Sequence, residues 1–82
     1  MNRLRTQSDY RIVEEADYKG YHVRVVCGYH VVEDNYLVHL YISPPGGPET
    51  RVFNPPRSEN NLEDALDLGF FEGPSEIDQL AP

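Results

Sequence analysis

The sequence contains a single cysteine, no tryptophan and no long apolar run, and these shortages exclude whole classes of protein. Because a lone Cys27 cannot form an internal disulfide, the chain is not a small secreted domain held together by disulfides. No apolar stretch approaches the roughly 18–20 residues of a membrane span. Residues 1–8 carry charge but precede no apolar run, which is not the pattern of a signal peptide. We therefore expect a cytoplasmic protein with no membrane partner.

Basic residues are missing from the chain after Arg57. The net charge is −7, from 7 basic and 14 acidic residues. Half of the acidic residues follow Arg57: Glu59, Glu63, Asp64, Asp67, Glu72, Glu76 and Asp78. The other half balance the basic residues, so the net charge lies on the C-terminal segment. Since affinity for phosphate backbones comes from Lys and Arg, we expect no nucleic-acid partner. An acidic segment attracts a basic protein partner, or serves only to keep a small protein in solution.

A chain of 82 residues has room for one domain. Such a short chain buries only about 60–65% of its unfolded surface, so its core is thin. The sequence nevertheless holds 6 tyrosines, 3 phenylalanines and many β-branched residues, enough for one packed layer. We expect residues 1–9 to be a flexible N-terminal tail and residues 10–80 to form a single α+β domain.

An alternating pattern over residues 21–31 predicts a long strand. Apolar residues occupy the odd positions: Tyr21, Val23, Val25, Cys27, Tyr29 and Val31. A period of two is that of a strand with one buried face. Further along the chain, the apolar set moves to the even positions: Tyr36, Val38, Leu40 and Ile42. The two runs predict a β-hairpin.

The change of parity restricts how these two strands pair. Both apolar faces must lie on one side of the sheet, so an odd residue pairs with an even one. A two-residue turn at Asp34-Asn35 satisfies this rule by pairing Val31 with Val38. Asp and Asn tolerate the left-handed conformations that such a turn requires. A four-residue loop, which pairs Val31 with Tyr36, satisfies the rule as well. We prefer the two-residue turn.

Shorter patterns predict the remaining strands. Residues 10–15 form a plausible short strand, and Gly20 indicates a turn after it, because glycine adopts positive φ without steric cost. Residues 50–53 form another short strand. Prolines on both sides suit an edge position, where they prevent unwanted pairing.

A helix is expected at the C-terminal end. Its apolar stripe has helical spacing and consists of Leu62, Ala65, Leu66 and Gly69. Asn60 is its expected N-cap, with Glu63 three residues later. Gly73-Pro74 should end or sharply bend the helix, and residues 75–80 either form a further helical turn or fray. The predicted fold is α+β: a three- or four-stranded antiparallel β-meander with one C-terminal helix packed on one face.

The order of these elements, with Tyr18-Lys19-Gly20-Tyr21 opening a strand, resembles a family of short, uncharacterised bacterial proteins. Members begin with a Y-K-G-Y strand, continue through two or three antiparallel strands and close with a helix that ends near Ile-Asp. The remaining matching residues here are Ala65, Gly69, Gly73 and Ile77-Asp78. The resemblance covers roughly residues 10–80, and Pro74 departs from it by falling inside the helix. The family has no assigned activity, so the resemblance implies a β-β-β-α order and nothing about chemistry.

Histidines provide the arrangement closest to a metal site. By parity, His22, His30 and His39 lie on the side of the hairpin away from the core. With the Asp34-Asn35 turn, His30 faces His39 at a Cβ separation of about 4.5–5.5 Å. Such a pair binds Zn²⁺, Ni²⁺ or Cu²⁺ if a third ligand exists, but His22 is about 26 Å away along the strand. We expect surface histidines, no metal and no cofactor. A metal- or small-ligand-binding accessory protein is the alternative function.

No catalytic arrangement can be assembled from the remaining residues. Cys27 lies in an apolar face, where a thiol behaves as a small hydrophobe. Paired carboxylates occur only as sequence neighbours, which on a strand point to opposite faces. The serines lack a nucleophile-elbow motif, and Gly46-Gly47 is followed by neither a lysine nor a helix start. We expect the protein not to be an enzyme.

One helix covers only one side of a small sheet, which leaves the other face available. By parity that face carries Val26, Leu37, His39 and Tyr41, and we take these four residues as the candidate interaction face. Aromatic residues offer contact area together with a polar tip. The face either binds a protein partner, including a second copy of the chain as a homodimer, or is covered by the N-terminal segment or residues 75–80. We favour a small non-catalytic protein-interaction domain.

Overall fold

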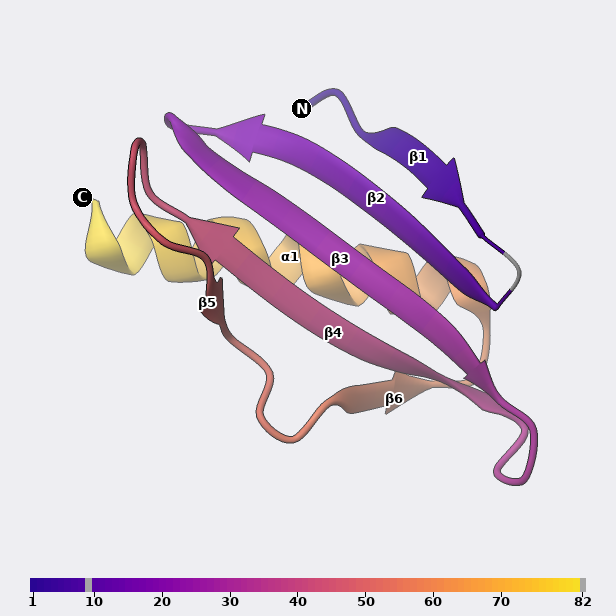
Figure 1. Ribbon diagram of the computed structural model, residues 1–82. Helices are drawn as coiled ribbons and strands as arrows, with labels where there is room; N and C mark the ends of the chain where they lie inside the picture. The colour runs from indigo at the N-terminus through magenta and orange to yellow at the C-terminus, as the bar shows by residue number, and fades with distance from the viewer. Residues whose placement is uncertain (9, 82) are drawn as a thin grey trace.

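The computed structural model describes residues 1–8 and 10–81, which form one antiparallel sheet with a helix behind it (Figure 1). The strands are β1 (Leu4–Gln7), β2 (Arg11–Tyr18), β3 (Tyr21–His30), β4 (Asn35–Ser43), β5 (Thr50–Arg51) and β6 (Arg57–Glu59). The helix is α1 (Leu62–Leu80). The predicted α+β class, with an antiparallel sheet and one C-terminal helix on one face, is confirmed.

The sheet is larger than the three or four strands predicted. Its 6 strands run in the order β1-β2-β3-β4, and both β5 and β6 pair with the free edge of β4. Thr50–Arg51 lies at this edge, as its flanking prolines indicated. The sequence analysis missed β6 because its three residues are too few to show a period.

Strand β1 corrects the expectation of a flexible tail over residues 1–9. Leu4–Gln7 pairs antiparallel to β2, with Leu4 opposite Glu15. Two ion pairs hold it: Arg3 and Arg5 contact the two carboxylate oxygens of Glu14 at 2.8 and 2.6 Å. Glu14 is buried, so its paired charge depends on these two arginines. Residues of β1 are exposed along its whole length, which explains why no apolar alternation revealed the strand.

The hairpin confirms the parity rule but not the preferred turn. Tyr29 lies opposite Tyr36, and Val25 lies opposite Leu40. Residues 31–34 form a four-residue loop, so the predicted Asp34-Asn35 turn is wrong, and the pairing is shifted from that of either alternative. Asp34 adopts the left-handed φ of 52°, and its carboxylate accepts a hydrogen bond from the Tyr29 hydroxyl. The pairing of β3 with β4 therefore ends at His30 and Asn35, earlier than the apolar pattern predicted.

The buried side of the hairpin is the one that the alternation predicted. Residues with at most 1% exposure come from both strands: Val23, Val25, Cys27, Val38 and Leu40. Tyr29 is half-exposed, and Val31 lies in the loop and is exposed. The core is therefore formed by the middle of β3 and β4, where α1 packs.

Helix α1 begins one residue later than predicted and continues much further. Asn61, rather than Asn60, is the N-cap, and its side chain accepts a hydrogen bond of 2.9 Å from the Asp64 N–H. The helix passes through Pro74, which corrects the predicted end at Gly73-Pro74. The Ser75 hydroxyl donates to the Phe71 carbonyl at 2.9 Å in the turn that the proline disturbs. Ile77, completely buried, holds the last turns against the core.

Two glycines let α1 lie unusually close to β3. A Cβ atom added to Gly69 would lie 2.5 Å from Val25 Cγ1, and one added to Gly73 would lie 2.9 Å from Val23 Cγ1. Side chains at these positions would push the helix away from the sheet. The glycines therefore provide the contact that brings α1 onto this face.

The face of the sheet opposite α1 carries no helix (Figure 1). Residues 4–7 extend the sheet as β1, and residues 75–80 belong to α1 behind it. Neither segment covers this face, so the intramolecular cover that we considered is not formed by the described residues. We call this surface the open face. Among the described residues, no helix has the length and apolar character needed to cross a membrane.

Replacing Gly69 by alanine should destabilise the protein. The clash with the stiff, β-branched Val25 costs about 1–3 kcal/mol, which exceeds the roughly 1 kcal/mol that alanine gains over glycine in a helix. Urea denaturation of the Gly69→Ala variant should show the loss. In a Val25→Ala background the same substitution should become neutral or stabilising, because the clashing methyl groups are absent. An equal loss in both backgrounds would contradict the close packing.

Candidate binding surface

The open face holds all four residues of the candidate interaction face. Val26 of β3 lies opposite His39 of β4, and Leu37 and Tyr41 flank His39 on the same side of β4. These residues lie together because β3 and β4 are paired, so that the non-core side chains of both strands point to the same face. Val26 is buried although no element covers it, since neighbouring side chains of the sheet enclose it.

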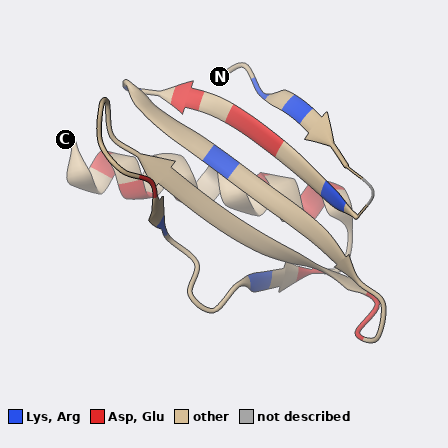
Figure 2. Cartoon of the chain, viewed as in Figure 1, with Lys and Arg blue, Asp and Glu red and all other residues tan. Residues whose placement is uncertain are grey.

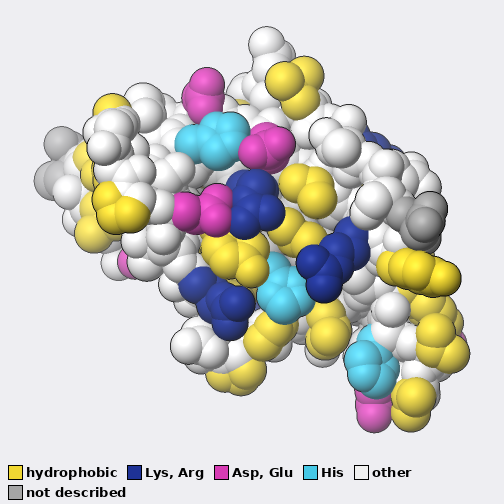
Figure 3. All heavy atoms as spheres, in the orientation of Figure 1, with side chains coloured by type: hydrophobic (Ala, Val, Ile, Leu, Met, Phe, Trp, Pro, Cys, Tyr) yellow, Lys and Arg dark blue, Asp and Glu magenta, His cyan; other side chains and the backbone are white. Residues whose placement is uncertain are grey.

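A hollow of about 360 Å³ lies at the centre of the open face. Its lining comes from β2, β3, β4, β5 and the segment before β2: Ser8, Arg11, Val13, Arg24, Val26, His39, Tyr41 and Arg51. Figure 3 shows basic side chains gathered around a histidine on this face, with apolar side chains between them. Among residues 1–8 and 10–81, the lining contains three arginines and no carboxylate.

The sequence analysis missed the arginines of this hollow. Arg24 had a usable signal, since it falls on the even, non-core positions of its strand. Arg11 and Val13 belong to the strand predicted over residues 10–15, but the weak alternation of that strand did not indicate which of its faces lies away from the core. Arg51 gave no local signal, because its place beside Tyr41 depends on the pairing of β5 with β4.

Tyr41 is held between two guanidinium groups. The Arg24 and Arg51 guanidinium carbons lie 4.4 and 5.8 Å from the centroid of its ring. Cations at these distances are attracted to the ring face. The ring of His39 is stacked with that of Tyr41 at 6.5 Å between centroids. Tyr41 is therefore positioned before any partner arrives.

Arg24 is fixed by a two-point contact with Glu49. Its Nε and Nη2 atoms donate to the Glu49 carboxylate at 2.9 and 2.7 Å. These hydrogen bonds raise the pKa of Arg24 and lower the pKa of Glu49. Glu49 precedes β5, so this ion pair also ties the loop before β5 to the centre of the sheet.

His39 forms part of the hollow's floor as a neutral group. Burial lowers its pKa, and the charges of Arg51 and Arg11 lower it further. Its Nδ1 atom is buried and has no hydrogen-bond partner among the described residues. The hollow therefore contains one unsatisfied polar atom and an excess of positive charge.

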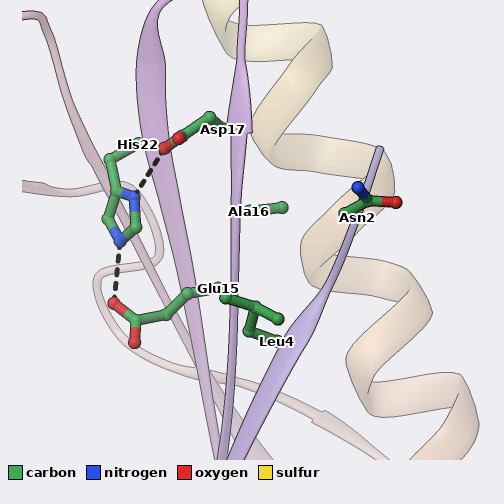
Figure 4. Close-up of a pocket in the computed structure, with 6 residues that line it drawn as sticks. All are labelled: Asn2, Leu4, Glu15, Ala16, Asp17 and His22. Atoms are coloured by element: carbon green, nitrogen blue, oxygen red, sulfur yellow. Dashed lines mark hydrogen bonds and ion pairs between the residues drawn. The ribbon is translucent and has the colours of Figure 1, made fainter.

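A second cluster on the open face centres on His22 (Figure 4). Its Nδ1 lies 2.9 Å from Asp17 Oδ1, and its Nε2 lies 2.7 Å from Glu15 Oε1. Hydrogen bonds with Glu15 and then Asp17 raise the pKa of the imidazole. Ala16, Leu4 and Asn2 complete the lining of an adjoining hollow of about 440 Å³. Since both ring nitrogens are already paired, the cluster has no free imidazole nitrogen to offer a ligand.

The structure does not bring His30 and His39 together. His39 lies opposite Val26 and His30 opposite Asn35, so the predicted pairing of the two histidines is wrong. The reason is the shift in hairpin register, since their juxtaposition required the two-residue turn. Across residues 1–8 and 10–81, no group of three or more His, Cys, Asp and Glu residues is placed to hold a metal ion.

Cys27 lies in the core, where the alternation placed it. Burial raises the pKa of its thiol to about 12, with a smaller contribution from Glu14. A thiol of this kind carries almost no thiolate near neutral pH and is a poor nucleophile. Its role in the described structure is packing.

Comparisons with family models, with curated proteins and with solved structures found no match to this chain. The resemblance to the bacterial family with a Y-K-G-Y strand therefore stays a prediction.

Protonation of His22 should stabilise the protein at low pH. Its pKa is raised in the folded state, so the contribution is present below the ordinary histidine pKa near 6.5 and is lost as pH rises through the folded value. The ring is 42% exposed, which limits the effect to less than about 1 kcal/mol. Urea denaturation at about pH 6 and about pH 9 should show that His22→Gln costs more at the lower pH.

His30→Gln is the matched control for this measurement. The His30 ring accepts a hydrogen bond from the Glu33 N–H and has no carboxylate partner within the described residues. Its substitution should have a smaller pH dependence than that of His22. Equal pH dependence at both positions would contradict the role of Glu15 and Asp17.

Proposed function

We propose that this chain is a non-catalytic protein-interaction domain whose contact surface is the open face. The observation that carries the proposal is an uncovered sheet face in which arginines, Tyr41 and His39 surround apolar side chains. Tyrosine and arginine are enriched in protein interfaces and among the residues that carry most binding energy. The partner is another protein or a second copy of the chain.

Preorganisation supports a role in binding. Tyr41 lies between two guanidinium groups, and Arg24 is held by Glu49, so these side chains lose little conformational freedom when a partner docks. Val26 is already enclosed and offers a fixed apolar base. A surface of this kind binds by direct docking rather than by rearrangement.

The environment of the titratable side chains also supports a non-catalytic role. Cys27 is buried in the core, where a thiol packs as a small hydrophobe. His22 is bound by two carboxylates, and the described residues that line the hollow around His39 include no carboxylate. The alternative of a metal site at His30 and His39 lacks its geometric basis, because these residues are not neighbours across the hairpin.

Site-specific photo-crosslinking in the native cell tests the contact surface. A photoreactive phenylalanine derivative replaces Leu37 on the open face, and in a second variant it replaces Phe71, which is 71% exposed on α1. We expect crosslinked protein from position 37 and little from position 71. A product of twice the mass of the chain identifies self-association. Absence of products from position 37, or equal yields from both positions, would overturn the proposal.

A further inference from the structure

The hollow on the open face is a positive site on an acidic protein. The chain has a net charge of −7, and acidic residues lie along α1 (Figure 2). On the opposite side of the sheet, Arg11, Arg24 and Arg51 come from β2, β3 and β5 and line one hollow, to which the described residues contribute no carboxylate. Because the three arginines come from three different strands, the positive site forms only when these strands are assembled in the folded protein.

Four of the seven basic residues are paired with carboxylates within the molecule. Ion pairs hold Arg3, Arg5, Lys19 and Arg24. Within residues 1–8 and 10–81, Arg11 and Arg51 have no ion-pair partner, and both line the hollow. Arg57 also has none there, but it belongs to the opposite face and stacks over Phe53 at 5.3 Å. The hollow therefore contains two positive charges, those of Arg11 and Arg51, that no carboxylate of the described residues neutralises.

A polar atom of the hollow floor also lacks a partner. His39 Nδ1 is buried without a hydrogen bond among the described residues, and such atoms are rare in folded proteins. Arg51 and Arg11 both lower the pKa of His39, which places their charges near the ring. A bound anion would offset both charges and would accept a hydrogen bond from Nδ1 in the imidazole tautomer that carries its proton there.

The surroundings of the charges are apolar. Val13 and Val26 lie between the arginines, and Leu37 lies beyond them on β4. Gly28 separates Arg11 from Leu37 in the ladder, and its missing side chain leaves space between them. A ligand bound in the hollow thus contacts guanidinium groups and aliphatic side chains together. This combination fits a peptide segment in which carboxylates alternate with small apolar side chains, since guanidinium groups bind carboxylates in two-point contacts.

We infer that the hollow of the open face binds a carboxylate from an acidic, aliphatic segment of a partner protein, between Arg11 and Arg51 and above His39. This inference rests on the proposed function, because it names the partner chemistry for the same surface. A nucleic acid is a poorer occupant, since only a small site opposes the net charge of −7. A second copy of the chain is disfavoured by mutual repulsion of the same net charge.

Nuclear magnetic resonance titration of the ¹⁵N-labelled chain of 82 residues at low salt tests the site. The probe is a short, terminally blocked peptide in which glutamate alternates with valine and serine, and the matched peptide has glutamine in place of glutamate. We expect the glutamate peptide to shift the signals of Val13, Val26 and His39. The glutamine peptide should leave them in place.

A pair of variants separates the site from general charge. The double variant Arg11→Gln/Arg51→Gln should weaken binding of the glutamate peptide at least about 10-fold, because it removes from the hollow the two guanidinium groups that have no ion-pair partner within residues 1–8 and 10–81. Arg57→Gln removes the same kind of charge from the opposite face and should change affinity less than about 2-fold. The amide spectra of both proteins report directly whether they are folded.

Several results would overturn the inference. Equal binding of the two peptides, or undiminished binding to the double variant, would show that the arginines do not select carboxylates. Tighter binding of a single-stranded oligonucleotide would assign the hollow to nucleic acid. A wild-type dimer that dissociates in the double variant, seen by light scattering, would assign it to a second copy. If the peptides fail while position 37 still gives crosslinks, only the partner chemistry is refuted; if both fail, the proposed function is refuted as well.

Discussion

Helix α1 approaches β3 so closely at Gly69 and Gly73 that added Cβ atoms would lie within 2.9 Å of valine methyl groups. This contact decides how the rest of the chain is arranged. It buries the middle of β3 and β4 against one helix, and it places Ile77 deeply enough to keep α1 helical beyond Pro74. Because the chain has no second helix in the described structure, the opposite face stays open. The binding surface is therefore a consequence of one-sided packing.

The open face differs from the rest of the molecule in its electrostatics. The acidic residues of the C-terminal segment lie along α1, on the other side of the sheet (Figure 2). Pairing of Glu14 with Arg3 and Arg5 and of Glu49 with Arg24 uses part of the basic complement. Arg11 and Arg51, which have no ion-pair partner among the described residues, line the hollow beside His39 and Tyr41. An overall negative charge is thus compatible with a local site for anions, since interactions are screened beyond about 10 Å in ordinary salt.

Much of the core could be predicted from the alternation of residues 21–31 and 36–42. A period of two identifies which side chains share a face, because that property depends only on the local geometry of a strand. Val26, Leu37, His39 and Tyr41 were assigned to the non-core face on this basis, and the structure places them there. The hairpin register was not predictable in the same way. The observed pairing leaves residues 31–34 as the loop, which a hydrogen bond from Tyr29 to Asp34 spans, and no pattern of apolar residues indicates either feature.

The sequence alone determined the class of fold, the two faces of the hairpin and the position of the acidic segment. These features follow from periodicity and composition, which are local properties of the chain. The tertiary structure decided which residues meet. It joined β1 to the sheet through the buried Glu14, kept α1 continuous through Pro74, and separated His30 from His39. It also brought Arg11, Arg24 and Arg51 to one hollow from three different strands. Contacts of this kind depend on strand pairing between distant segments, and a local sequence pattern does not indicate which segments pair.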